Sequence, residues 1–422
     1  MDRLGALREF NFRRLWVGQT TSAFGDALAG VAVTFGILGV TGSAVDLGLV
    51  LTAFMVPRVV FLLVGGVWAD RIPRRTIMLG ADIVRALAQA ALAVAFLSGA
   101  ASLPIFIAVA VATGAASAFF VPASIGLVPQ TVSAERLQPA NALLNLSQSS
   151  AFLAGPVVSG LLLVTIGPGW IFAIDAVTFG VSAAALAMLR LPALPPIATR
   201  PFLADLAIGW REVVSRSWLV ASLAGFAFVN LAFAGFFVIA PVVVERSYGG
   251  APDWGILMAG FGLGGILGGA LALRWSPGRP LVAVFAVLLA APLTLLFLAG
   301  LPPFALLAVA VTVFAAGTAF ANTIWHTTLQ RQVPAESISR VSSYDWMASL
   351  LFFPIGSALA GPLSEALGPP TALVGFAAAS GVAMVATLAV PKVRALRRVE
   401  VPGIVDPPGT PDQMDPLAAE AA

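Results

Sequence analysis

The stretch Gly66-Val67-Trp68-Ala69-Asp70-Arg71-Ile72-Pro73-Arg74-Arg75 joins two long apolar runs, at residues 46–68 and 76–98. About 20 apolar residues in a helix are enough to cross the hydrocarbon core of a bilayer. Charged residues are costly inside that core, so a turn with one aspartate and three arginines belongs at its surface. The segment therefore predicts a loop between two membrane-spanning helices.

The composition of the whole chain agrees with a membrane protein. Of the 422 residues, 59% are hydrophobic and 10% are charged, whereas soluble domains have about 45–50% apolar and about 25% charged residues. The chain has no cysteine and one histidine. This composition excludes disulfides, thiolate metal sites and histidine-rich metal sites, so we expect neither a metal nor another cofactor.

Twelve apolar runs are long enough to span a membrane, and Pro and Gly within them are compatible with membrane helices. They lie at residues 16–40, 46–68, 76–98, 103–127, 141–166, 170–189, 218–243, 254–273, 280–299, 302–326, 341–366 and 371–390. The expected fold class is therefore an all-α membrane protein with twelve transmembrane helices.

The positions of the basic residues indicate the orientation. With a cytoplasmic N-terminus, 20 of the 23 Lys and Arg residues fall on the cytoplasmic side, and Arg246 alone falls on the other side. Basic residues are strongly enriched in cytoplasmic loops. The asymmetry predicts two cytoplasmic termini, an even number of spans and a multi-pass protein of the inner (cytoplasmic) membrane.

The chain divides into two expected halves. Residues 1–190 and 218–391 each contain six predicted spans, and a cytoplasmic linker at 191–217, with an amphipathic stretch near its end, joins them. Residues 392–422 turn basic, then proline-rich and acidic, which predicts a disordered cytoplasmic tail.

A weak internal repeat supports two pseudo-symmetric halves. At an offset of 201 residues, Phe152, Gly155 and Gly160 align with Phe353, Gly356 and Gly361. A parallel repeat about an axis along the membrane normal relates the two halves of one large class of transporters.

The basic turn resembles the signature G-x-x-x-D-R-x-G-R-R of the major facilitator superfamily. The matching residues are Gly66, Asp70, Arg71, Arg74 and Arg75. The family's glycine is replaced by Pro73, which stiffens the turn and leaves the charges in place. The resemblance implies a gating loop whose aspartate contacts the start of the eleventh span across the two halves. The alternative is that the arginines serve topology alone.

Another stretch resembles the antiporter motif G-P-x-x-G-G of drug exporters. It contains Gly155, Pro156 and Gly160, with Ser159 in place of one glycine. Small residues on one helix face allow another helix to approach closely, so general helix packing is the competing interpretation. The motif favours export.

The charged residues within predicted spans include Asp26, Arg58, Asp82 and Arg85. A charge at the bilayer centre is costly and marks function by default. Burial favours the neutral form of a carboxyl group, so Asp26 is the first candidate for proton coupling. A structural pair with Arg58 is the alternative. The spacing of Asp82 and Arg85 favours a structural pair.

Other polar residues in the spans complete the candidate set. Asn230, Asn322 and His326 are expected to line the cavity in the second half. Asp175 is expected near the outer surface, in contact with solvent, and Asp345 within reach of the arginine loop.

Further residues resemble one bacterial branch of the superfamily, the branch that holds the enterobactin exporter and macrolide-efflux proteins. They are the stretches 10–16, Gly25-Asp26, 120–122 and 139–141. The resemblance implies proton-driven export of an amphipathic drug, natural product or siderophore by a monomer that alternates access through a rocker-switch. A nutrient importer or facilitator is the first alternative.

Two remote alternatives are a membrane-embedded enzyme and a non-transporting receptor. The sequence has no clustered catalytic groups of the kind that such enzymes use, and no sizeable soluble domain to carry a signal. The expected partners are therefore a small-molecule substrate, protons and lipid, and neither enzymatic activity nor nucleic-acid binding is expected.

Overall fold

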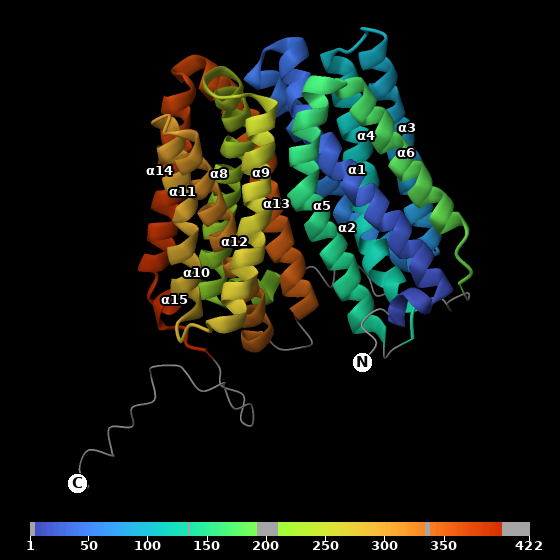
Figure 1. Cartoon of the computed structure of the whole chain (residues 1–422). Helices are drawn as coiled ribbons and strands as arrows, with labels where there is room; N and C mark the ends of the chain where they lie inside the picture. Colours follow the sequence, from blue (N-terminus) through green and yellow to red (C-terminus); the bar gives the residue numbers. More distant parts are fainter. Residues whose placement is uncertain (1–4, 134–135, 192–209, 334–337, 399–422) are drawn as a thin grey trace, which may run out of the picture.

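The computed structural model describes residues 5–133, 136–191, 210–333 and 338–398, which are helical and contain no β-strand. Most of the apolar runs predicted as spans correspond to long α-helices, as expected for an all-α membrane protein (Figure 1). The elements are η1 (Gly5–Arg8), α1 (Phe10–Thr41), α2 (Ala44–Arg71), α3 (Arg74–Leu97), α4 (Leu103–Leu127), η2 (Val128–Gln130), α5 (Leu137–Thr165), α6 (Pro168–Ala187), α8 (Ser217–Ser247), α9 (Ala251–Arg274), α10 (Pro280–Leu288), α11 (Ala290–Ala299), α12 (Phe304–Gln332), α13 (Ile338–Leu367), α14 (Pro369–Ala389) and α15 (Pro391–Ala395).

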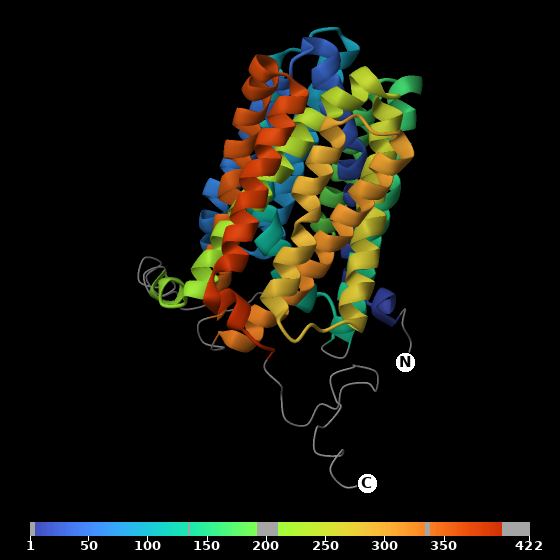
Figure 2. The same cartoon turned by 90° about the vertical axis from the view of Figure 1, so that its left-hand side faces the viewer.

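The helices form two groups that stand side by side. Helices α1–α6 make up the N group, and α8–α15 make up the C group; Figure 2 views the molecule from the side of the C group. Helix α1 begins and α14 ends at the same end of the bundle, which we call the terminal end, and the opposite end is the distal end.

Eleven stretches within the described residues are long and apolar enough to cross a membrane. The remaining predicted span, 341–366, is the eleventh in chain order; it lies in α13, a helix of 30 residues whose apolar described part is the shorter stretch Leu351–Leu367. A multi-pass helical membrane protein is thus confirmed, and the count of twelve spans stays a prediction.

The predicted span 280–299 is divided between α10 and α11. Pro292 has no backbone N–H, and its ring clashes with the carbonyl of the fourth residue before it, which is Leu288. Helix α10 ends at that residue. The proline therefore accounts for the break, which the apolar run alone does not reveal.

Glycines hold α9 against α12 within the C group. Gly260, Gly264 and Gly268 all face α12, where added methyl groups would meet Thr312 or Ala316. The residues follow each other at four-residue intervals, so they form one helix face on which the two backbones approach closely.

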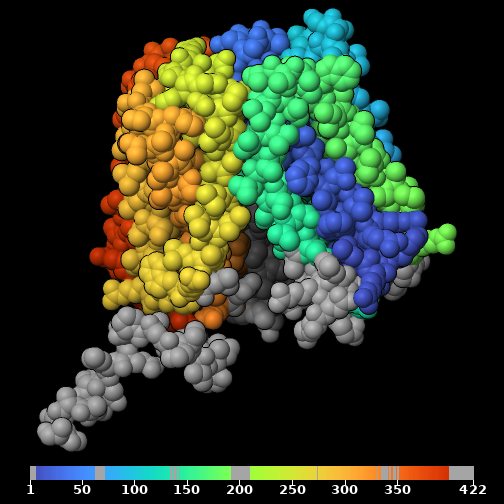
Figure 3. Space-filling model, in the orientation of Figure 1, coloured from blue at the N-terminus to red at the C-terminus, as the bar shows by residue number. Residues whose placement is uncertain are grey.

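The two groups contact each other along α2–α13 and α5–α9. Near the distal end, Thr52 Oγ1 lies 2.9 Å from Ser357 Oγ, and Gly361 packs on the backbone of Val45. On the other seam, Gly160 packs on Ala251. In Figure 3 the yellow α9 and green α5 surfaces meet in the upper part of the view and separate toward the terminal end. The molecule is therefore closed at its distal end.

Most of the predicted linker 191–217 lies outside the described residues, including the first part of its amphipathic stretch. The predicted tail 392–422 is described only as far as Arg398. Its first residues continue α15, and the Arg398 backbone N–H donates to the Gly278 carbonyl at 3.0 Å. This part of the tail is folded against the loop between α9 and α10.

Candidate functional site

A cavity of about 230 Å³ lies within the N group, and we call it the N cavity. Its charged and amide-bearing walls come from Asp26 on α1 and from Arg85 and Gln89 on α3. Phe54 and Phe106 are among its apolar walls. A cavity with a few polar groups among aromatic side chains is the usual form of a small-molecule site.

Asp26 projects into the N cavity. Its side chain is exposed, and the residue forms part of the cavity wall. The described ion pairs do not include one between Asp26 and Arg58, although both residues lie in the described part. The Arg58 guanidinium lies 5.8 Å from the centre of the Phe54 ring instead. Asp26 is thus an accessible carboxyl without a fixed counter-ion.

Arg85 is held on several sides at the wall of the same cavity. Its Nη2 donates to Asp82 Oδ1 at 2.6 Å, and both residues are buried. Its guanidinium also lies 4.0 Å from the centre of the Phe120 ring and 4.6 Å from that of Phe179. An arginine that contacts two aromatic rings and pairs with a carboxylate has a fixed position and a balanced charge.

The expectation that Asp175 is solvated near the outer surface is wrong. Asp175 has an exposed fraction of 0%, and its carboxyl packs against Gly25 of α1. Position along the chain predicts how deep a residue lies but not which way it faces, and this residue faces the neighbouring helix α1. Nothing in the sequence beyond its place inside a span signalled this contact.

A second cavity, of about 280 Å³, lies within the C group, and we call it the C cavity. Asn230, Asn322 and His326 line it together, and the last two have exposed side chains. The Asn230 amide donates to the Phe226 carbonyl at 3.0 Å. Phe233 also contributes to the wall, so this cavity combines amides, an imidazole and aromatic rings.

Asp345, expected within reach of the arginine loop, lines the C cavity. Its Oδ2 accepts a hydrogen bond of 2.9 Å from Trp325 Nε1, and both residues are buried. Trp325 and Asp345 are 20 residues apart and lie on different helices, α12 and α13. No helical spacing therefore relates them, and the sequence did not predict this pair.

Only part of the predicted gating loop can be located. The side chains of Gly66, Asp70 and Arg71 lie outside the described residues. Arg74 Nη1 donates to the Gly126 carbonyl at 2.5 Å, and Arg75 donates to the Ala187 carbonyl. These two arginines thus bind the ends of α4 and α6 within the N group.

The antiporter-like motif lies where α5 meets two other helices. Gly155 packs on Ala27 of α1, and Gly160 packs on Ala251 of α9 in the other group. Ser159, which replaces a motif glycine, donates its hydroxyl to the Leu28 carbonyl at 2.6 Å. The Pro156 carbonyl lies against Gly255 of α9. The motif therefore belongs to both the α1 contact and the seam between the groups.

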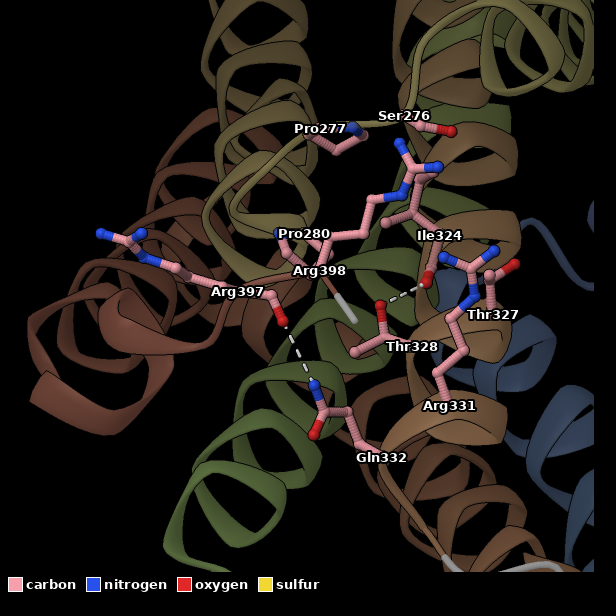
Figure 4. A pocket seen from close by; sticks show the side chains of 10 residues that line it. All are labelled: Ser276, Pro277, Pro280, Ile324, Thr327, Thr328, Arg331, Gln332, Arg397 and Arg398. Carbon is pink, nitrogen blue, oxygen red and sulfur yellow. Dashed lines mark hydrogen bonds between the residues drawn. The ribbon is translucent and has the colours of Figure 1, made fainter. Parts of the chain in front are cut away.

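A third pocket, of about 50 Å³, lies at the terminal end of the C group. In Figure 4, Arg398 reaches toward Ser276, Arg331 lies beside Thr327, and Arg397 points away. Gln332 Nε2 donates to the Arg397 carbonyl at 3.2 Å. The residues around this small pocket hold the chain after α15 in place. The pocket is separate from the two larger cavities.

Curated proteins with similar sequences include exporters. The chain is 28% identical over 374 residues to the enterobactin exporter EntS of Escherichia coli O1:K1. It has the same identity over the same length to EntS of Shigella boydii serotype 18. The match covers 88% of this chain and 88% of each relative.

Solved structures with a similar fold include transporters of other kinds. A mutant of the nucleoside transporter NupG matches with a TM-score of 0.73 and 13% identity, over 90% of this chain and 99% of that chain. An auto-inhibited POT family peptide transporter matches with a TM-score of 0.72 and 13% identity, over 94% of this chain and 99% of that chain. At these identities the likeness concerns the fold alone.

The family model described as Major Facilitator Superfamily matches residues 15–351, which is most of the chain. The two helix groups, the multi-pass architecture and the exporter relatives agree with that match. The resemblance seen in the basic turn is confirmed, and the chain belongs to the major facilitator superfamily.

Proposed function

We propose that this transporter exports a small amphipathic compound by proton antiport, with Asp26 as the coupling carboxyl. The observation that carries the proposal is the exposure of Asp26 to the N cavity without an ion pair. A carboxyl that can be reached from the cavity can take up and release a proton during the cycle. The similarity to the enterobactin exporter supports export over import.

The C cavity is our candidate for most of the substrate contacts. Aromatic rings and amides bind amphipathic molecules with little demand on their charge. Asn230, Asn322 and His326 supply the polar contacts, and Phe226 and Phe233 the apolar ones. Proton binding in the N group would then be coupled to substrate binding in the C group through the contacts between the two groups.

The cycle we propose is a rocker-switch between residues 1–190 and 218–391, linked by 191–217. Both termini would be cytoplasmic in the inner membrane, so the distal end faces outward and is closed in this conformation. Opening would part the α2–α13 and α5–α9 seams at that end. We expect the protein to act as a monomer.

Transport into inside-out membrane vesicles tests the proposal. A panel of amphipathic dyes and siderophores serves as substrate. Respiration makes the interior of the vesicles acidic and so imposes the proton gradient. We expect the parent to accumulate at least one compound and Asp26→Asn to lose gradient-driven accumulation by more than tenfold. Asp46→Asn, which replaces an aspartate in the first turn of α2, is the matched control and should transport as the parent does.

Two results would contradict the proposal. Gradient-driven accumulation that persists in Asp26→Asn removes the coupling role from that residue. Accumulation only in right-side-out vesicles would identify an importer, the alternative that the sequence left open.

A further inference from the structure

Buried polar atoms without a hydrogen-bond partner gather on three helices of the N group. Within the described residues, all such side-chain atoms belong to α1, α3 and α6; they come from Gln19, Thr20, Asp82, Arg85, Gln89, Asp175 and Ser182. An unsatisfied polar group at membrane depth costs several kcal/mol. Packing between α1, α3 and α6 alone gives no reason for such groups to gather there. This region is where we expect chemistry beyond that of Asp26.

Asp175 lies at the centre of this region, sealed from the N cavity. Its exposed fraction is 0%, and a methyl group on Gly25 would overlap its carboxyl. The next residue along α1 is Asp26, which faces the cavity. The two carboxyls therefore lie on different sides of the same short segment of α1, one occluded and one accessible.

The charges around Asp175 do not favour a second carboxylate. The charged groups that act on it electrostatically are Asp26 on α1 and Arg85 on α3. Arg85 already pairs with Asp82 at 2.6 Å, and Arg58 of α2 faces Asp26. An ionised Asp175 would add a buried negative charge beside Asp26 without a counter-ion of its own, which is strongly unfavourable.

The hydrogen atoms available at Asp175 point the same way. The Thr178 hydroxyl oxygen lies 2.8 Å from the Asp175 backbone carbonyl and 3.1 Å from Oδ1. A hydroxyl has one hydrogen to donate, so it can make only one of these two contacts a full hydrogen bond. The other oxygen of the carboxyl, Oδ2, has no partner. A proton on the carboxyl would supply the missing hydrogen.

We propose that Asp175 is a second proton-binding carboxyl of the transport cycle, protonated and occluded behind Gly25 while Asp26 exchanges protons with the N cavity. The role in the cycle rests on the proposed proton antiport. Two carboxyls that interact strongly titrate as a coupled pair, in two steps that belong to both. Asp175 thereby sets the protonation behaviour of Asp26 and is a positioning residue for the coupling step.

Infrared spectroscopy of the purified full-length protein tests the protonation directly. A protonated carboxyl has a C=O stretch distinct from that of a carboxylate, and an occluded one exchanges slowly into D2O. We expect a slowly exchanging acid band in the parent, its loss in Asp175→Asn, and its retention in Asp26→Asn and in the matched control Asp46→Asn. An unchanged band in Asp175→Asn would overturn the proposal.

The pH profile of export tests the role in the cycle. With a fixed gradient, the parent rate should depend on pH in two steps, and Asp175→Asn should keep gradient-driven export with a single step. A parent profile with one step, or the same profile in both proteins, would overturn the coupling role. The infrared result needs no substrate, so loss of the proton site and failure of the antiport proposal are distinguishable.

A second variant covers the case in which Asp175→Asn does not fold. Thr178→Val preserves the carboxyl and removes the hydroxyl beside it, with little change of side-chain volume. The acid band should then shift in frequency because the hydrogen-bond partner is lost. A band at the parent frequency would contradict the assignment to Asp175.

Discussion

The side chain of Arg85 shows how this protein keeps a cation inside a bilayer. Its charge is balanced by Asp82, and its guanidinium lies over the rings of Phe120 and Phe179. Only a planar guanidinium can bind a carboxylate at one edge and stack on rings at the same time. The residue is therefore fixed in place, whereas Asp26, on the same cavity, has no such partner.

Replacing Arg85 by lysine should reveal the value of this arrangement. The charge remains, but the ammonium group cannot stack on both rings, and desolvated cation–π contacts are worth about 2 kcal/mol. We expect Arg85→Lys to lower the apparent midpoint of thermal unfolding in detergent, measured by tryptophan fluorescence. Arg246→Lys, an exposed arginine near the distal end, should leave the midpoint unchanged. Equal midpoints in the two variants would contradict the stacking argument.

The positions of the helices could largely be predicted from the sequence. Which face each helix turns toward its neighbours could not. Apolar runs predicted the long helices because the bilayer requires a certain length of apolar helix. The break at Leu289 was missed because hydropathy does not register the clash that Pro292 causes. Asp175 was misplaced, and the Trp325–Asp345 bond was not foreseen, because depth in a span leaves the rotation of the helix undetermined. The gating loop was recognised from its motif, yet its aspartate lies outside the described residues.

The close contact between α9 and α12 within the C group can be tested by substitution at Gly264, with the adjacent Gly265 as the control. A methyl group on Gly264 would overlap the Thr312 carbonyl and lie 2.7 Å from Ala315 Cβ, so the helices would have to separate. Such overpacking costs about 1–3 kcal/mol. Gly265 has no heavy atom within 4 Å of the same position, and alanine there should be neutral or stabilising by up to about 1 kcal/mol. Unfolding midpoints of Gly264→Ala and Gly265→Ala should therefore move in opposite directions, or the second should not move. Similar losses in both variants would rule out the close approach as the cause.

At the scale of the whole molecule, the closed distal end depends on backbone contact between the two groups. Gly361 of α13 packs on Val45 and lies close to the Ala44 carbonyl, so a methyl group there would meet main-chain atoms that cannot move aside. In the proposed cycle this contact would exist only while the distal end is closed. Alanine at this position should therefore destabilise the closed conformation relative to the open one, without disturbing the interior of either group.

Distances between spin labels can measure this shift, because the chain contains no native cysteine. Labels at Ala100→Cys, in the loop after α3, and Leu367→Cys, at the end of α13, would report the separation of the groups at the distal end; both positions are exposed. We expect Gly361→Ala to increase the population with the longer distance. The control Gly375→Ala lies on α14, where nothing occupies the position of the added methyl group, and should give the parent distribution. Since a ligand or mutation shifts populations only by its different energy in the two states, an unchanged distribution in Gly361→Ala would mean that this contact does not stabilise the closed state.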